Sequence, residues 1–167
     1  SIKLESKTIN SKKVKVEFLH NGTKKSLDAE VLLMAVGITA NTENLGLENT
    51  KVKLDRGHIT TNGVCQTTEG NIYAIGDVAG APWLAHKASH EGIIAVEHIA
   101  GKKPHELNKL NIPGCTYSTP QIASVGMTEK SALAAGYKLK IGRFPFYANG
   151  KALILGDTEG VIKTVFD

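Results

Sequence analysis

The chain has 167 residues, of which 41% are hydrophobic and 22% charged, and its formal net charge is +4. This length suits one ordinary domain or parts of two smaller ones. No apolar run approaches the roughly 20 residues that a membrane-spanning helix needs, so we expect a soluble globular protein with no membrane partner.

The basic residues are almost all Lys, because Arg occurs only at Arg56 and Arg143. Arg is the side chain that most often reads guanine, so this bias argues against a nucleic-acid partner. The two cysteines, Cys65 and Cys115, form neither a CxxC pair nor a metal-ligand cluster. They predict two half-buried free thiols in a reducing compartment, and no metal site.

The first part of the chain has the pattern of a β-meander. Alternating apolar residues predict strands over 2–8 and 14–18, and Asn21-Gly22 is a turn signal that favours a hairpin into the next strand. The apolar block over 31–36 suits a strand buried on both faces. It ends at Gly37, and a glycine there lets backbone or a ligand approach closely.

The middle of the chain combines two short strands with one long helix. Strands are predicted over 58–61 and 71–75, and a helix over 83–100. Gly101, followed by two Lys, is a helix stop signal. The apolar residues of this helix that recur at helical spacing are Leu84, Ala88, Ala95, Val96 and Ile99.

The last part of the chain returns to β character and predicts an α+β module with an antiparallel sheet. A strand is predicted over 122–126, and a short helix over 130–135 with Thr128 as its N-cap. Three further strands are predicted over 137–144, 152–155 and 161–166.

Gly76 and Asp77 directly follow the strand predicted over 71–75. An ionised Asp only accepts hydrogen bonds, and a ribose or ribityl hydroxyl is a natural donor. The helix start that follows offers free backbone N–H groups and a partial positive charge. Together these features predict a site for a polyhydroxylated, anionic cofactor. The alternative is an Asp that only caps the loop.

Five segments carry a resemblance to known proteins: residues 36–47, 67–78, 84–92, 112–129 and 144–152. The second contains the run NIYAIGDV and the third contains LAHKA. In order along the chain they resemble the pyridine-nucleotide disulfide oxidoreductases, and the LAHKA run resembles the dihydrolipoamide dehydrogenase branch of that family.

The resemblance implies a fold class of α/β plus α+β. Residues 1–55 would be the C-terminal part of a Rossmann-like NAD-binding domain with its β-meander. Residues 56–108 would be the second segment of the FAD-binding domain, and residues 109–167 the start of an antiparallel α+β dimerisation domain.

FAD and NAD are the cofactors that the resemblance implies. Trp83 stands where family members commonly have Met, and residues 38–40 replace a more usual Arg-Arg-Pro, so a charge contact from that turn is lost. The implied cofactor-binding residues are Gly76 and Asp77 at the ribityl chain, Trp83, Leu84, Ala85 and His86 against the flavin, and Gly37 near the nicotinamide nucleotide.

The family branch implies a parent protein that oxidises dihydrolipoamide and passes electrons through a redox disulfide and FAD to NAD. Its implied partners are a second copy, bound through the C-terminal module, and the lipoyl-bearing acyltransferase of a 2-oxoacid dehydrogenase complex. The implied location is the bacterial cytoplasm, or the mitochondrial matrix in a eukaryote. Two alternatives stay open: another flavin-dependent disulfide reductase, such as a mercuric reductase, and a stand-alone interaction domain.

Parts of that catalytic machinery are absent from the 167 residues: a Cys-x4-Cys segment, the GxGxxG fingerprints and the family's His–Glu pair. We therefore expect an internal piece of a longer protein, with no catalytic residue and no activity by itself. His86 is interpreted as a helix-start residue with a local hydrogen bond rather than a general base. His90 and His98 are expected on the polar side of the helix, and Lys87 in solvent.

Overall fold

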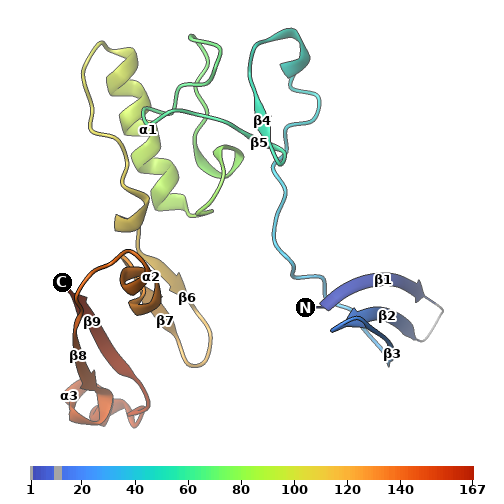
Figure 1. Cartoon of the computed structure of the whole chain (residues 1–167), viewed down its shortest axis with the longest axis vertical. Helices are drawn as coiled ribbons and strands as arrows, with labels where there is room; N and C mark the ends of the chain where they lie inside the picture. The colour runs from blue at the N-terminus through green and yellow to red at the C-terminus, as the bar shows by residue number, and fades with distance from the viewer. Residues whose placement is uncertain (1, 10–12) are drawn as a thin grey trace. The chain divides into compact units, whose positions relative to one another are not determined.

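The computed structural model describes residues 2–9 and 13–167, and these fall into two compact units that divide between Ile38 and Thr39 (Figure 1). In the first unit, β1 (Ile2–Ile9), β2 (Val14–His20) and β3 (Thr23–Ala29) form an antiparallel sheet in the order β1-β2-β3. The β2–β3 turn has positive φ at both Asn21 (51°) and Gly22 (78°), the conformation that matches the twist of a two-residue hairpin. The predicted hairpin is confirmed.

The apolar block over 31–36 is not a strand, and that prediction is wrong. Val31, Leu33 and Val36 are 80%, 84% and 87% exposed. A strand needs neighbours for its N–H and C=O groups, and no described strand pairs with this block. Its hydrophobicity alone therefore does not make it a strand here.

The second unit begins with a short 3-10 helix, η1 (Leu47–Asn49), and an antiparallel pair, β4 (Leu54–Asp55) and β5 (His58–Ile59). The strand predicted over 71–75 is reduced to a single bridge between Gln66 and Tyr73, so that prediction is wrong. Its backbone bonds reach back to residues 65–69, with the Ala74 N–H on the Cys65 carbonyl at 3.0 Å. The irregular hairpin then leads into η2 (Gly76–Ala79).

The long helix predicted over 83–100 is present as α1 (Ala85–Ile99). It ends in a Schellman arrangement, because the N–H of Gly101 donates to His98 O at 3.0 Å and that of Lys102 to Glu97 O at 2.9 Å. The predicted core face is wrong in part, since Val96 and Ile99 are 64% and 63% exposed. The buried residues of α1 are Lys87, Glu91, Ile94 and Ala95.

The C-terminal part contains two antiparallel pairs, β6 (Gly114–Thr116) with β7 (Ile122–Ser124) and β8 (Lys140–Pro145) with β9 (Val161–Phe166). Helix α2 (Glu129–Ala134) follows β7, and the Thr128 side chain accepts from the Ser131 N–H, as predicted. Short 3-10 helices η3 (Lys109–Asn111) and η4 (Phe146–Ala148) precede β6 and α3 (Gly150–Leu155).

The strand predicted over 152–155 is wrong, because those residues belong to α3. Asn149 caps the helix by accepting from the Ala152 N–H, and Gly156 ends it with φ 68°. Both are local signals that outweigh the β-like apolar run between them. The antiparallel α+β character expected of this part is otherwise present. No two strands of the described residues pair in parallel, so the Rossmann-like expectation depends on family membership, given below.

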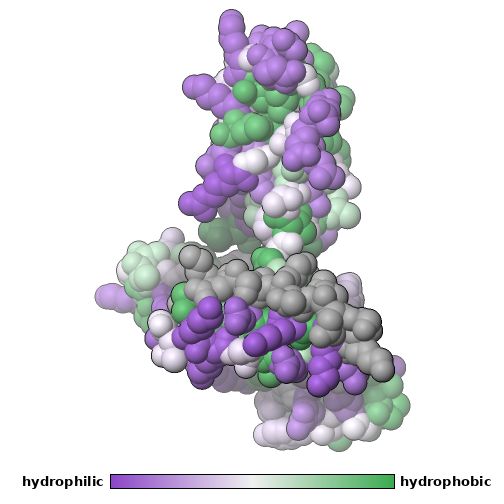
Figure 2. All heavy atoms as spheres, turned by 90° about the vertical axis from the view of Figure 1, so that its right-hand side faces the viewer, coloured by the Kyte–Doolittle hydropathy of each residue, from purple (hydrophilic) through white to green (hydrophobic). Residues whose placement is uncertain are grey.

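The central core of the second unit is small: Cys65, Ile94 and Ala95, with Val64, Tyr73 and Leu107 packed against them. Hydrophobic residues also lie at the surface among hydrophilic ones (Figure 2). Within residues 2–9 and 13–167, no helix is long and apolar enough to cross a membrane. The same residues contain no group of His, Cys, Asp or Glu side chains that could hold a metal ion.

Candidate cofactor site

The Gly76–Ala79 turn is joined to α1 by a buried ion pair. The Lys87 ammonium lies 3.0 Å from Glu91 Oε1, with side-chain exposures of 0% for Lys87 and 8% for Glu91. It also donates to the carbonyls of Gly76 at 3.1 Å and Gly80 at 2.9 Å. In return, Glu91 Oε2 accepts the Gly76 N–H at 2.7 Å. The pair therefore fixes both ends of the turn that carries Asp77.

The conformation of Gly76 explains the residue type at this position. Gly76 is buried and has φ 75°, a left-handed conformation that an L side chain adopts only at a cost. A Cβ there would meet the Ala88 Cβ at 3.4 Å, an ordinary contact. The backbone conformation, more than space, therefore requires glycine.

Asp77 is exposed at the first position after Gly76. Its backbone carbonyl accepts the Gly80 N–H at 3.1 Å, while no residue of the described chain hydrogen-bonds its carboxylate. The Asp77 side chain does not cap η2 or α1, because the caps of both elements lack a side-chain bond. The capping alternative is therefore wrong.

The start of α1 presents backbone donors. Leu84 occupies the N-cap position and provides no side-chain hydrogen bond, so the N–H groups of Ala85, His86 and Lys87 have no intrahelical acceptor. Trp83, 42% exposed, stacks on His58 with ring centroids 6.1 Å apart and planes at 20°. A polar cofactor carbonyl or phosphate suits these donors.

The hydrogen bond of His86 is not local, contrary to the prediction. His86 Nε2 donates to the carbonyl of Pro113 at 2.8 Å, 27 positions away. This bond ties the helix start to the segment that leads into β6. A pocket of about 430 Å³ lies beside it, lined among others by Pro82, Leu84 and Ile112. His86 therefore positions the helix start, and no geometry here marks it as a general base.

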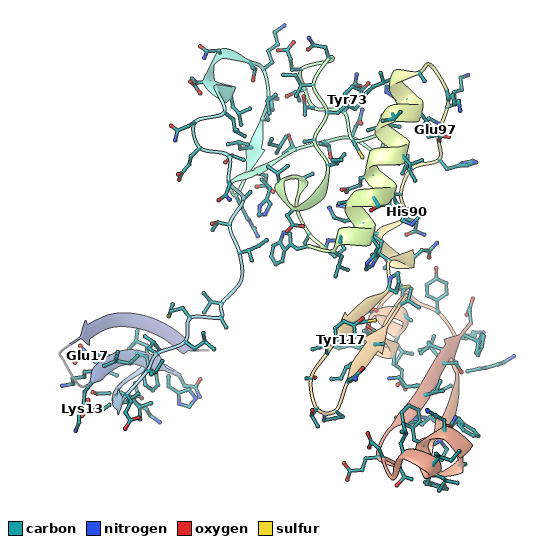
Figure 3. The ribbon with its side chains drawn as sticks, turned by 180° about the vertical axis from the view of Figure 1, so that it is seen from behind. Lys13, Glu17, Tyr73, His90, Glu97 and Tyr117 are labelled. Atoms are coloured by element: carbon teal, nitrogen blue, oxygen red, sulfur yellow. The ribbon has the colours of Figure 1, made fainter. Side chains whose placement is uncertain are left out.

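The other histidines of α1 differ from one another. His90 is exposed, as predicted, and Figure 3 labels it on the helix. His98 is half-buried instead, because its Nδ1 and the Tyr73 hydroxyl form a hydrogen bond of 2.8 Å. Tyr73 comes from the irregular hairpin, so this bond fastens the other end of α1.

Lys87 and Glu91 are the residues that the sequence interpretation missed, since Lys87 was expected in solvent. A signal was available. Lys87 stands in the first turn of α1, where the helix dipole disfavours a cation, so the position calls for a compensating partner. Glu91, four residues later, is that partner.

Both cysteines are free, with Cys65 buried and Cys115 exposed rather than both half-buried. Burial raises the pKa of the Cys65 thiol, and the nearby Glu91 carboxylate raises this pKa further, while Lys87 and Lys109 oppose the shift. A raised pKa leaves little thiolate near neutral pH, so Cys65 is not a ready nucleophile.

Gly37 belongs to the first unit and is exposed, with φ 123°. Gly76, Asp77 and the start of α1 belong to the second unit.

Comparison with protein families gives two matches. Residues 2–92 match the family described as "Pyridine nucleotide-disulphide oxidoreductase", and residues 112–167 match the dimerisation domain of the same family. The chain belongs to the pyridine nucleotide-disulphide oxidoreductase family. The family resemblance inferred from the sequence is thereby confirmed.

The chain is similar to curated dihydrolipoyl dehydrogenases. It is 58% identical to that of Zymomonas mobilis over 136 residues, which are 81% of this chain and 29% of the relative. It is 48% identical to one from Bacillus subtilis over 163 residues, which are 98% of this chain and 34% of the relative. The chain thus spans about a third of the length of these relatives.

Two solved structures share the fold. The crystal structure of LpdA from Mycobacterium tuberculosis has a TM-score of 0.86 and 27% identity, covering 98% of this chain and 35% of that one. The HOCl-induced flavoprotein disulfide reductase RclA from Escherichia coli has a TM-score of 0.83 and 28% identity, covering 99% and 38%. The family and the flavoprotein RclA both point to a flavin as the cofactor for which the residues of this site need to be suitable.

The residues present fit one side of FAD. The Asp77 carboxylate can only accept, which suits ribityl hydroxyls, and no described residue occupies it. The free N–H groups of Ala85 and His86 can only donate, which suits a flavin carbonyl. The acceptor, Asp77, lies on the Gly76–Ala79 turn, and the N–H donors lie at the start of α1.

Proposed function

We propose that these residues form one wall of the FAD site of a dihydrolipoyl dehydrogenase. Asp77 accepts hydrogen bonds from the ribityl chain, and the backbone at Leu84, Ala85 and His86 lies against the flavin. Gly37 lies near the nicotinamide of NAD. The observation that carries this proposal is the exposed carboxylate of Asp77, unpaired among described residues, next to a helix start whose N–H groups lack caps.

Bound FAD supplies a two-electron carrier between a dithiol and the nicotinamide. The proposed substrate is dihydrolipoamide on the acyltransferase of a 2-oxoacid dehydrogenase complex. Residues 109–167 provide the surface for a second copy, and the protein acts in the bacterial cytoplasm or the mitochondrial matrix. The similarity to curated dihydrolipoyl dehydrogenases supports the proposed substrate, and the match of residues 112–167 to the dimerisation domain supports the surface for a second copy. The 167 residues contain two cysteines with no Cys-x4-Cys spacing, so this chain alone is expected to be inactive.

The test compares Asp77→Asn with Asp157→Asn in the complete natural polypeptide. Asp157 is a matched control, because it is also exposed and follows α3 in the C-terminal module. Hydrogen bonds to a charged group contribute about 1.5–3 kcal/mol, so Asp77→Asn should weaken FAD binding by about tenfold to a hundredfold. Fluorescence titration of the apoprotein with FAD measures this. Equal affinity for both variants contradicts the proposed role of Asp77.

A second candidate is another flavoprotein disulfide reductase, favoured by the fold shared with RclA. It predicts the same FAD titration but no oxidation of dihydrolipoamide by NAD in the holoprotein. An interaction domain without enzymatic activity predicts neither. One titration and one spectrophotometric assay therefore separate the three.

A further inference from the structure

The buried pair of Lys87 and Glu91 lies directly behind the turn that carries Asp77. Neither side chain is placed to meet a bound molecule, because Lys87 is 0% exposed and the Glu91 side chain 8%. A fully buried Lys is rare unless its charge is paired. The pair therefore cannot act by direct contact with a cofactor, and its burial next to the turn requires another explanation.

The hydrogen bonds of the pair are directed at the turn. The Lys87 ammonium has three N–H donors, and its acceptors are the Gly76 carbonyl, the Gly80 carbonyl and the Glu91 carboxylate, all within 2.9–3.1 Å. Glu91 Oε2 takes the Gly76 N–H at 2.7 Å. Three backbone groups on the two sides of Asp77 thus end on this one pair.

Helix stability does not account for the pair. Lys87 is in the first turn of α1, where the helix dipole opposes a positive charge. Lys placed four residues before Glu is also the less favourable order for a helical pair. The Lys–Glu pair at the opposite end of this helix, Lys102 with Glu97, is exposed, and its N–O distance is 3.9 Å.

The geometry points to Lys87 and Glu91 as positioning residues of the cofactor site: they hold the 76–80 turn so that Asp77 faces the cofactor, and they thereby set how tightly FAD is retained. This inference rests on the proposed FAD site. The two residues act through the turn, without contact to the cofactor.

The first experiment needs no cofactor. Hydrogen–deuterium exchange of the complete apoprotein is compared between wild type, Lys87→Met and the control Lys102→Met. Lys87→Met should speed exchange at the Gly76 and Gly80 amides by at least about tenfold relative to the second half of α1, because the pair no longer holds the turn. Lys102→Met should leave these amides unchanged. Unchanged exchange in Lys87→Met overturns the inference.

The second experiment measures FAD binding by fluorescence titration of the same apoproteins. Lys87→Met should weaken FAD binding by about tenfold or more, and Lys102→Met by less than about twofold. A Lys87→Met protein that unfolds more easily but binds FAD as wild type does overturns the inference, because the pair is then structural only. If this variant does not fold, Glu91→Gln replaces it, since the Gln oxygen can still accept the Gly76 N–H; it should weaken binding about threefold, and wild-type affinity overturns the inference.

A charge swap separates the turn contacts from the ion pair. Lys87→Glu with Glu91→Lys keeps opposite charges four residues apart but places a carboxylate against the carbonyls of Gly76 and Gly80. FAD binding should stay weak in the swapped protein. Recovery to wild-type affinity overturns the inference, because pairing alone then suffices.

The proposed function can fail separately. Wild-type protein that binds no FAD contradicts the FAD site, whatever the exchange data show about the turn. Wild-type protein that binds FAD in an Asp77-dependent manner, with Lys87→Met unaffected, contradicts only the positioning role.

Discussion

Two regions of the second unit contain ion pairs that differ in burial. At the Gly76–Ala79 turn, Lys87 and Glu91 are almost fully buried and bind backbone groups as well as each other. In the C-terminal module, Glu129 on α2 meets Lys163 at 3.2 Å and Arg143 at 3.6 Å, with side-chain exposures of 37%, 42% and 58%.

The difference lies in what each pair is connected to. The exposed cluster joins three side chains that water can solvate equally well, so its net contribution is small. The buried pair hydrogen-bonds the backbone of the turn, at the Gly76 N–H and at the carbonyls of Gly76 and Gly80. Removal of one member therefore leaves an unpaired buried charge. The number of charged residues therefore does not predict which region contributes more to stability, whereas the burial of those residues does.

The largest expected effect is the loss of Lys87. Lys87→Met leaves the Glu91 carboxylate buried without its cation, and breaking such a pair costs about 3–5 kcal/mol of unfolding free energy. Urea denaturation of the apoprotein, followed by circular dichroism, measures it. Lys102→Met serves as control, and equal small changes for both variants contradict the contrast between the regions.

A smaller effect is expected from the glycine of the same turn. Gly76→Ala forces an L side chain to φ 75°, which costs about 1–2 kcal/mol. Gly150→Ala is the control, because Gly150 opens α3 and a Cβ there meets nothing within 4 Å. The two denaturation midpoints should move apart. A Gly76→Ala protein as stable as Gly150→Ala indicates that the turn relaxes.

The exposed cluster should respond least among the charge variants. Lys163→Met removes a half-exposed partner of Glu129, and Arg143 remains near the same carboxylate. The expected loss is below about 1 kcal/mol and diminishes further at high salt. Denaturation at low and high ionic strength tests this. A loss comparable to that of Lys87→Met removes the distinction between buried and exposed pairs.

The last prediction concerns stability at alkaline pH and expects no effect of the Cys65 thiol's ionisation near neutral pH. The pKa of Cys65 is raised in the folded protein, chiefly by burial, whereas an unfolded thiol has a pKa of about 8.5. Its contribution to stability is thus present below about pH 8.5 and is lost as pH rises through the folded pKa. Cys65→Ala should flatten the alkaline decline of the denaturation midpoint, and Cys115→Ala, at an exposed position, should not. Identical declines contradict the assigned pKa shift.

Several features followed from the sequence by itself, because they depend on local interactions. The Asn21-Gly22 hairpin, the Thr128 cap and the Gly101 stop of α1 each involve residues within a few positions of one another. The Gly76-Asp77 pair and the run around His86 also indicated a cofactor site and a family. The family is now shown, while the roles of the individual site residues stay predictions.

Tertiary structure alone decided the features that depend on partners far away or on burial. The apolar run over 31–36 is exposed because no described strand pairs with it, and His86 bonds to Pro113, which no spacing rule suggests. The turn of Gly76 is held by Glu91 and by Lys87, which was expected in solvent. A charge becomes a core element only when its full set of hydrogen-bond partners is assembled, and that set is a property of the fold.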